Sequence, residues 1–485
     1  GIEDAEAGRL LEDVKLLLDN EDLGKAFFER LSERSNTKLI DFENFNNNNF
    51  HVVTELTCQN GDEEFRPDIT LLINGMPLVF IEVKKPNNRE GILAERDRIN
   101  KRFQNSKFKR FANITQFMIF SNNMEYDDGD PEPVQGAFYA SSSYHKPVFN
   151  YFREEEILNL TALLKPVSDD DELKVLKDNN LEVIHSNPEF QTNKQPERPT
   201  NRICTSLLSR ERLAFILRYA LAYVSESDGL QKHIMRYPQL FATKAIERKL
   251  SDGVKKGIIW HTQGSGKSIL MVILAKWILE NRPNARIAIV TDRDELDKQI
   301  ERVFKDSEEE IYRTRSGKDL LRQLREPNPR LLCSLVHKFG RKDVENFNKF
   351  IKELEDNAPE VSGDLFVFVD ECHRTQSGKM HRVMKTILPN AVFIGFTGTP
   401  LLKKDKKKSI EVFGGYIHTY KFNEGVEDKV ILDLTYEARD IDQRISSPKK
   451  IDEWFEVTTQ DLNDFEKRAL KQKWGTMQKV SSSRP

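Results

Sequence analysis

The sequence lacks the features that place a protein in a membrane or in an oxidising compartment. No apolar run approaches the roughly 20 residues that span a bilayer, and the start of the chain shows no signal-peptide pattern. Cysteine is scarce, and the few present form no CxxC pair and have no histidine at zinc-ligand spacing; they are Cys58, Cys204, Cys333 and Cys372. We therefore expect a cytoplasmic protein with reduced thiols and no membrane partner.

An excess of charge of one sign is also missing. The chain of 485 residues carries 75 Lys and Arg against 78 Asp and Glu, a net charge of −3. This balance does not exclude a DNA partner, because large DNA enzymes concentrate basic side chains in grooves while their outer surface stays acidic. The length exceeds what one hydrophobic core usually supports, so we expect two or three domains.

The chain divides by pattern into α/β segments joined by a polar stretch. Residues 1–167 mix helical segments with strand-like runs, which indicates a mixed α/β domain. Residues 168–204 carry an acidic run and several prolines, a composition typical of a linker. From 205 to 425, continuous apolar strands alternate with helices, which predicts a parallel sheet covered on both faces.

Charged residues interrupt an apolar strand in the first segment. Residues 78–83 are apolar until Glu82, where a charge is costly inside a sheet. Side chains alternate faces along a strand, so Glu82 and Lys84 share one face and Lys85 points away. Asp68 lies just before the neighbouring strand. Two carboxylates and a lysine in one place are suited to hold a divalent cation against a phosphodiester.

The dipeptide Asn74-Gly75 between these strands predicts a hairpin and makes the register a test. A two-residue loop would put Asp68 and Glu82 on opposite faces. A three-residue loop with Gly75 in the left-handed conformation brings Asp68 directly opposite Glu82, with Cβ atoms about 5 Å apart. We predict the three-residue loop.

A phosphate-binding loop follows a predicted buried strand at 257–260 and precedes a predicted helix at 269–279. Its residues run His261, Thr262, Gln263, Gly264, Ser265, Gly266, Lys267, Ser268. The glycines let backbone N–H groups turn toward a phosphate, Lys267 would neutralise the β- and γ-phosphates, and Ser268 would ligate Mg²⁺. His261 stands where the full GxxxxGK[ST] pattern has its first glycine.

Two further predicted strands end in polar residues. The strand at 365–369 ends in Asp370-Glu371, which predicts that Asp370 holds Mg²⁺ and Glu371 polarises the attacking water. The strand at 392–396 ends with Thr397 and Thr399, whose hydroxyls could couple the γ-phosphate to domain movement or simply form a turn.

The motifs at 261–268, 370–373 (a DECH box) and 397–400 resemble motifs I, II and III of superfamily 2 helicases and translocases. Residues 290–299 resemble motif Ia, which implies contact with the nucleic-acid backbone. Tyr237-Pro-Gln239 resembles the Q-motif. That likeness implies that Gln239 contacts the adenine edge and that Tyr237 stacks on the base.

The predicted hairpin resembles the PD-(D/E)xK nuclease family, with Asp68, Glu82 and Lys84 matching residue by residue. Some relatives add a Gln-x-x-x-Tyr pair on the next helix. Here Gln104 is followed at that spacing by Phe108. The basic segment 89–110 either lines a DNA groove or is the solvated face of a helix, whereas the lysine cluster at 403–408 reads as a solvated loop.

Together, a nuclease-like domain and a motor domain resemble the motor/restriction (R) subunit of type I restriction–modification enzymes. The resemblance implies ATP and Mg²⁺ as cofactors, double-stranded DNA as substrate, and modification and specificity subunits as partners. It also implies that 426–485 begins a second RecA-like lobe that this chain does not complete. We expect such a chain to bind ATP weakly and to hydrolyse it poorly.

Two other functions stay open on the sequence. One is a repair or phage-defence helicase–nuclease that works without a methyltransferase. The other is a DNA-binding motor scaffold with an inactive nuclease. Neither can be separated from the first by sequence alone.

Overall fold

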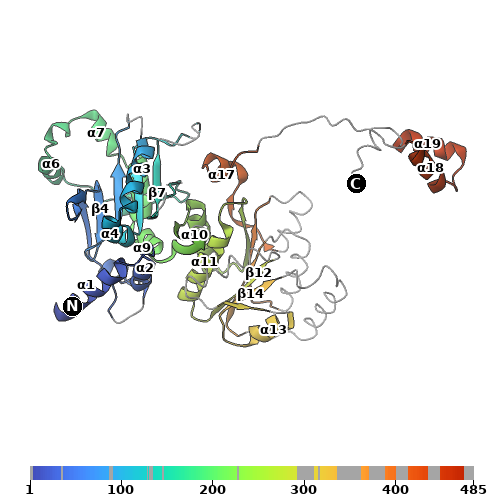
Figure 1. The fold of residues 1–485 in the computed structure, drawn as a ribbon, viewed down its shortest axis with the longest axis horizontal. Helices are drawn as coiled ribbons and strands as arrows, with labels where there is room; N and C mark the ends of the chain where they lie inside the picture. The colour runs from blue at the N-terminus through green and yellow to red at the C-terminus, as the bar shows by residue number, and fades with distance from the viewer. Residues whose placement is uncertain are drawn as a thin grey trace. The chain divides into compact units, whose positions relative to one another are not determined.

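The computed structural model describes residues 4–33, 37–86, 91–127, 129, 135–144, 147–226, 229–291, 311–314, 317–335, 362–370, 388–399, 413–434 and 448–474. The chain forms two compact units, residues 1–432 and 433–485. The first unit contains two large sheets, one blue to cyan in Figure 1 and one green to orange.

The first sheet is mixed, as the sequence predicts. Its order is β1-β4-β5-β6-β7-β8, with β5 and β6 parallel and the other neighbours antiparallel. The strands are β1 (Phe50–Thr54), β4 (Ile69–Ile73), β5 (Met76–Val83), β6 (Phe117–Ser121), β7 (Ala137–Ala140) and β8 (Asn150–Tyr151). A short hairpin of β2 (Cys58–Asn60) and β3 (Glu63–Phe65) lies outside this sheet. The parallel β5–β6 step needs a crossover, which α3 (Gly91–Gln104) and α4 (Lys109–Ile114) supply. Helices α1 (Asp4–Leu18) and α2 (Lys25–Ser32) pack against α4.

The hairpin register differs from the prediction at the turn but not at the acidic residues. Asn74 (φ 50°) and Gly75 (φ 81°) are both left-handed, so the loop has two residues and Ile73 pairs with Met76. The Asn74 side chain holds this turn, because its Nδ2 donates to Leu39 O at 2.9 Å and its Oδ1 accepts from Asn49 N at 2.8 Å. The three-residue loop was therefore wrong.

A bulge within the hairpin restores the predicted pairing of the carboxylates. The register shifts between Leu71 and Leu72, so that one extra residue of β5 is accommodated before Ile69 pairs with Ile81. Asp68 precedes β4 by one residue, so extending this register by one step would bring it opposite Glu82, and its Oδ2 accepts from the adjacent Val83 N at 2.8 Å. The dipeptide Asn74-Gly75 signals the turn, and Pro77 precedes the extra residue, a position where proline is found in strands.

The expected linker is helical. Residues 168–204 contain α6 (Asp169–Asp178), α7 (Pro188–Asn193) and most of α8 (Pro199–Leu208). The acidic run is the first turn of α6, with the Ser168 side chain accepting from Asp171 N, and acidic residues there complement the helix dipole. Prolines begin α7 and α8, a position where the missing N–H costs nothing. Helix α8 packs against β6 and β7, and α9 (Arg210–Tyr219) follows it.

The second sheet is parallel, again as predicted. Its order is β13-β14-β12-β15-β16-β11-β17, and every pairing is parallel. The strands are β11 (Lys256–His261), β12 (Ala285–Thr291), β13 (Ile311–Arg313), β14 (Leu331–Leu335), β15 (Asp364–Val369), β16 (Val392–Thr397) and β17 (Tyr416–Tyr420). The hairpin of β9 (Leu221–Glu226) and β10 (Gly229–Ile234) forms a separate pair.

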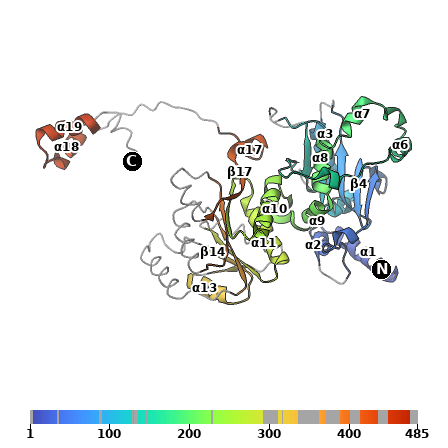
Figure 2. The ribbon, with the colours of Figure 1, turned by 180° about the vertical axis from the view of Figure 1, so that it is seen from behind.

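Helices α10 (Tyr237–Ser251) and α11 (Lys267–Asn281) lie next to each other on one side of the parallel sheet (Figures 1 and 2). Helix α11 is apolar and buried over most of its length because it contacts β12, α9 and α10. Helix α13 (Gly317–Arg325) packs Leu320 and Leu324 into the core with β12 and β14, and α17 (Phe422–Glu427) follows β17.

The second unit contains α18 (Pro448–Thr458) and α19 (Asp464–Trp474) among its described residues, joined by an ion pair of Lys467 and Glu456 at 2.9 Å. That 426–485 begins a second RecA-like lobe stays a prediction. Within the described part of the chain, no helix is both long and apolar enough to span a bilayer. The three cysteines that the structure describes, at 58, 204 and 333, are free thiols.

A buried lysine of the β9–β10 hairpin packs against the mixed-sheet domain. Lys232 on β10 is 5% exposed, and its Nζ donates to Thr115 O at 2.8 Å and to Ser142 Oγ at 3.4 Å. Burial lowers the pKa of Lys232 to about 7, against a weaker opposing effect of Asp22. The folded protein therefore holds this ammonium less readily than the unfolded chain does.

Replacing Lys232 by Met should stabilise the protein, most strongly at low pH. A lysine whose folded pKa is depressed imposes its full penalty below that pKa, and the penalty fades as pH rises toward the ordinary value of about 10.4. We expect the midpoint of thermal unfolding to rise by several degrees at pH 6 and by much less at pH 9.5, measured without nucleotide. An equal gain at both pH values would show that the amine is not the source.

Candidate functional site

The predicted nuclease residues converge at the open end of the β4–β5 hairpin. Lys84 Nζ lies 3.6 Å from Glu82 Oε2 and 3.9 Å from Asp68 Oδ2. Asp68 Oδ2 also accepts from Val83 N at 2.8 Å, which fixes this carboxylate beside the end of β5. Glu82 is fully buried, whereas Asp68 and Lys84 are partly accessible. The structure thus brings all three side chains together.

A third carboxylate, missed in the sequence, completes the cluster. Glu95 on α3 is 2% exposed and lies 3.0 Å from Lys84 Nζ. Arg98 Nη2 links it to the strand, at 2.7 Å from Glu95 Oε1 and 3.2 Å from Glu82 Oε2. The signal that could have found Glu95 is its helical spacing from Arg98 and Arg102, which places all three on one face of the crossover helix.

Part of the basic segment 89–110 faces the acidic cluster and part of it belongs to the core. Arg98 and Arg102 face the acidic cluster, and Phe103 and Phe108 belong to the core. Lys109 and Arg110 pair with acids near the N-terminus instead, at 3.0 Å from Glu21 and 2.6 Å from Asp19.

Glu82 is a buried carboxyl whose pKa is strongly shifted. Burial above all, with Glu95 and Asp68 adding to it, raises its pKa to about 8, although Lys84 and Arg98 oppose the shift. Its Oε1 is buried and accepts no hydrogen bond from the described residues; Arg102 Nη1 is 3.8 Å away. Among those residues, no group of three or more His, Cys, Asp or Glu side chains is arranged as a metal site. A cation here would take protein ligands from Asp68 and Glu82 and complete its shell with water or phosphate oxygens.

The phosphate loop connects β11 to α11 and has an open apex. Gly264 (φ 79°) and Gly266 (φ 83°) are left-handed, and Gln263 and Gly264 are exposed. Ser265 Oγ donates to Thr262 O at 2.6 Å, which closes the turn. Lys267 Nζ donates to the loop carbonyls of His261 at 3.2 Å and Thr262 at 3.3 Å. Ser268 lies in the first turn of α11, beside the N–H groups that favour an anion.

The ends of β15 and β16 reach the same edge of the sheet as this loop. Strand β16 lies between β15 and β11 and pairs Thr397 with Trp260, and a Cβ on Gly398 would meet Lys267 Nζ at 2.9 Å. Asp370 follows β15 and is 3% exposed. Thr397 Oγ1 lies 3.4 Å from Thr399 N, a contact made within the turn itself. Glu371, residues 292–299 of the motif Ia match, and 403–408 lie outside the described residues.

Gln239 and Tyr237 both make hydrogen bonds within the protein. Gln239 Oε1 accepts from Arg236 N at 2.8 Å, and its Nε2 donates to Gly266 O at 2.9 Å, so its amide joins α10 to the phosphate loop. Tyr237 is 2% exposed and donates to Asp428 Oδ2 at 2.5 Å, which leaves no ring face open to a base in this structure. A hydrogen bond to adenine by Gln239 stays a prediction.

His261 links the phosphate loop to the mixed-sheet domain, a role its sequence position did not suggest. Its Nε2 lies 2.8 Å from His418 Nδ1 on β17, and His418 Nε2 lies 2.6 Å from Glu155 Oε2. Burial, followed by His418 and Lys267, holds the pKa of His261 well below its ordinary value. The ring is therefore neutral near pH 7. A glycine at this position would break the chain of contacts.

A second link converges on Asp428, just after α17. Tyr237 and Tyr420 both donate to its Oδ2, the latter at 2.8 Å, and Arg153 Nη2 lies 3.6 Å from its Oδ1. Nearby, Tyr126 OH donates to Glu427 O at 2.9 Å. Because Tyr126 and Arg153 belong to the mixed-sheet domain, these contacts fasten it to the parallel-sheet domain.

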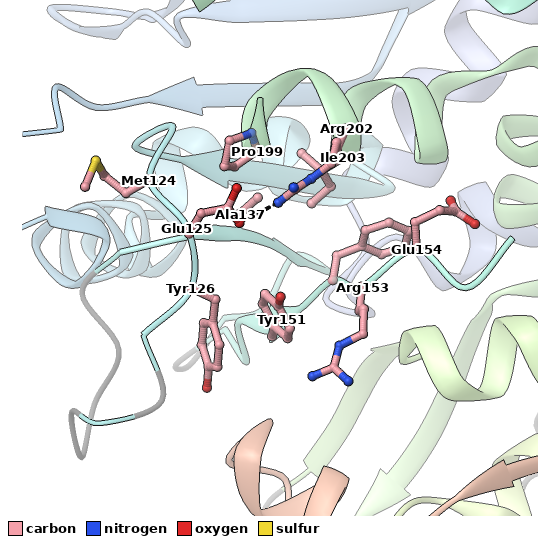
Figure 3. A pocket seen from close by; sticks show the side chains of 11 residues that line it. Met124, Glu125, Tyr126, Ala137, Tyr151, Arg153, Glu154, Pro199, Arg202 and Ile203 are labelled. Atoms are coloured by element: carbon pink, nitrogen blue, oxygen red, sulfur yellow. Dashed lines mark hydrogen bonds and ion pairs between the residues drawn. The ribbon is translucent and has the colours of Figure 1, made fainter. Parts of the chain in front are cut away.

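Beside this link is a cavity of about 310 Å³, shown in Figure 3. Tyr126 and Tyr151 stack within it with ring centroids 4.0 Å apart, and Arg202 pairs with Glu125 at 2.7 Å. The Arg153 side chain extends away from the other lining groups and reaches Asp428. The cavity is thus bordered by the same residues that join the domains.

Replacing Asp428 by Ala should destabilise the first unit. The change leaves two buried tyrosine hydroxyls without their acceptor and a partly buried arginine without one partner, a loss of roughly 2–4 kcal/mol. The matched control is Glu427→Ala, because the Glu427 side chain is 44% exposed and lies 3.8 Å from the same Arg153 but accepts from neither tyrosine hydroxyl. We expect a thermal midpoint several degrees lower for Asp428→Ala alone. Equal midpoints for the two variants would contradict a hub role.

The fold and these sites define a class: a mixed-sheet domain with a carboxylate–lysine cluster, followed by a parallel-sheet domain with a phosphate loop. Residues 4–130 match the family model of the type I restriction enzyme R protein N terminus, and residues 238–468 match that of the SWI2/SNF2 ATPase. In this order, the two matches are to the N-terminal part of type I restriction enzyme R proteins and to the SWI2/SNF2 ATPase, so the chain is similar to these two families over the matched residues.

Curated proteins described as type I restriction enzyme endonuclease subunits are similar to this chain, which matches only part of their length. The HindI type I restriction enzyme endonuclease subunit of Haemophilus influenzae is 29% identical over 83% of this chain and 36% of its own. The SauCOLORF180P subunit of Staphylococcus aureus is 26% identical over 88% of this chain and 39% of its own. The chain therefore spans less than half the length of these relatives.

Solved structures also match in part. The Sulfolobus solfataricus SWI2/SNF2 ATPase core in complex with dsDNA is 14% identical to this chain. The match covers 39% of this chain and 35% of the solved chain, with a TM-score of 0.28. A nuclease-deletion mutant of the Type ISP restriction-modification enzyme LlaGI, in complex with a DNA substrate mimic, is 17% identical to this chain. The match covers 40% of this chain and 20% of the solved chain, with a TM-score of 0.30.

Proposed function

We propose that this chain supplies the nuclease and part of the motor of a type I restriction–modification complex. In this role it couples ATP-dependent translocation of double-stranded DNA to Mg²⁺-dependent cleavage of the phosphodiester backbone, together with modification and specificity subunits. The observation that carries the proposal is the convergence of Asp68, Glu82 and Lys84 in a domain that is hydrogen-bonded to a phosphate-loop domain.

For cleavage, Asp68 and Glu82 would hold Mg²⁺, which fits the buried Glu82 Oε1 that accepts no hydrogen bond from the described residues. The bound ion would supply Lewis acidity to the phosphodiester. Lys84, partly exposed between the carboxylates, would orient the attacking water or stabilise the charge of the pentavalent phosphate. Glu95 would act as a positioning residue because it holds Lys84 and Arg98 in place.

For nucleotide hydrolysis, the left-handed glycines present loop N–H groups to the phosphates, and Lys267 exchanges its loop carbonyls for phosphate oxygens. Ser268 and Asp370 would ligate the nucleotide's Mg²⁺, and Glu371 would polarise water. Thr397 and Thr399 would pass a change at the γ-phosphate to β16, which ends so close to Lys267 that a Cβ on Gly398 would lie 2.9 Å from its Nζ.

Exchanging one lysine at a time should separate the two activities. In the complex with modification and specificity subunits, Lys84→Ala should reduce DNA cleavage at least about 100-fold and leave ATPase activity within about twofold, because a charge-stabilising group near the transition state is lost. Lys85→Ala is the matched control, since Lys85 is an exposed neighbour. Cleavage by Lys84→Ala at the wild-type rate would refute the nuclease assignment and favour an inactive scaffold.

Lys267→Ala should abolish ATPase activity and translocation and, with them, cleavage far from the recognition site. The change removes the only loop cation that reaches the phosphates in this proposal. Lys249→Ala, at an exposed position in the last turn of α10, is the control. Unchanged ATP hydrolysis by Lys267→Ala would exclude this loop as the nucleotide site.

The partners need a separate measurement. We expect modification and specificity subunits to co-purify with the full-length protein that contains this chain. Robust DNA-dependent cleavage without any methyltransferase would favour a stand-alone helicase–nuclease instead.

A further inference from the structure

A cavity of about 280 Å³ opens beside the phosphate loop, between the two domains. One wall consists of Gly264, Gly266 and Ile269, from the loop and the start of α11. Val148 and Asn150, which belong to the mixed-sheet domain, also line it. Its size lies just under the roughly 300 Å³ at which small-molecule pockets usually begin, enough for a nucleoside.

Strand β16 and helix α10, which lie on two sides of the phosphate loop, indicate how a bound triphosphate would be oriented. The end of β16 approaches Gln263 and Lys267, where the β- and γ-phosphates would bind. Helix α10 contacts the other side, because Gln239 donates to Ser265 O at 3.2 Å and to Gly266 O at 2.9 Å. The cavity lies on this second side, since Gln239 also lines it. A triphosphate with its γ-end at Lys267 therefore extends toward the cavity.

We propose that this cavity holds the base and ribose of the nucleotide, so that the nuclease-like domain forms one wall of the ATP site. The inference rests on the proposed function of the phosphate loop. It assigns to Asn150 and Val148 a part in nucleotide affinity that neither the loop nor the Q-motif likeness implies.

Two polar side chains in the cavity are weakly engaged and suited to a nucleoside. Arg236 Nη1 is 3.4 Å from Gly264 O, and its Nε is 3.4 Å from Asn150 Oδ1. Asn150 Nδ2 makes only long contacts of its own, at 3.4 Å to Val148 O and 3.5 Å to Tyr139 O. These distances exceed the usual range for hydrogen bonds, so a ligand replaces them at little cost. A guanidinium stacks on aromatic faces, and an amide matches the donors and acceptors of a base or ribose.

The wall from the nuclease-like domain is held firmly enough to act as a binding surface. Tyr139 OH donates to Met235 O at 2.7 Å, and Ser141 Oγ donates to Lys232 O at 2.6 Å, both within buried surroundings. These bonds join the end of β7 to β10 and to the residue before Arg236. A fixed wall costs less ordering on binding than a mobile one.

The experiment compares ATP with inorganic tripolyphosphate, which has no base. Binding to the full chain is measured for wild type, Val148→Trp, Asn150→Ala and Lys267→Ala. Both cavity variants should weaken ATP at least fivefold, Val148→Trp by filling the mouth and Asn150→Ala by removing a polar group. Their affinity for tripolyphosphate should stay within twofold of wild type.

The control Val52→Trp places the same side chain at another exposed valine of this domain, on β1, and should bind both ligands normally. The inference is overturned if both cavity variants bind ATP like wild type, if they lose tripolyphosphate equally, or if Val52→Trp shows the same loss. Unchanged ATP binding by Lys267→Ala would instead overturn the proposed nucleotide site itself, so the two failures are distinguishable.

Discussion

The buried carboxylate of Asp428 is the contact on which the arrangement of the two domains depends. It takes hydrogen bonds from α10 and β17 through Tyr237 and Tyr420 and lies beside Arg153 of the mixed-sheet domain. A buried carboxylate is costly without partners. Here Oδ2 accepts from both tyrosines, whereas Oδ1 has only the 3.6 Å contact with Arg153 and no hydrogen bond from the described residues. Because α10 also holds the phosphate loop through Gln239, the hub fixes the nucleotide site relative to the nuclease-like domain.

A similar constraint shapes the acidic cluster. Glu82 ends an apolar strand with no exposure, and three cations approach it: Lys84, Arg98 and Arg102. Their charges do not fully offset burial, since the pKa of Glu82 still rises to about 8. Burial therefore disfavours the charged form of this carboxyl even beside three cations. The same reasoning explains why a charged helix face, rather than an apolar one, covers this end of β5.

Direct contacts join the phosphate loop to the domain that contains the acidic cluster. The phosphate loop reaches Glu155 through His261 and His418, and the proposed base cavity is walled by Val148 and Asn150. Nucleotide binding at the loop would thus bear on residues of the nuclease-like domain by direct contact. This follows from packing between two sheets far apart in sequence, so no motif describes it.

The sequence by itself predicted several strands of both sheets, the parallel order of the second sheet, and the residues that come together at the end of the β4–β5 hairpin. These depend on local patterns: apolar runs, glycine spacing and alternation along a strand. Tertiary structure alone decided the bulge that faces Asp68 toward Glu82, the addition of Glu95, and the burial of Tyr237 against Asp428. Each of these features depends on contacts between elements that are distant in the chain. Local periodicity does not specify those partners, so it does not predict the burial and hydrogen bonding that they create.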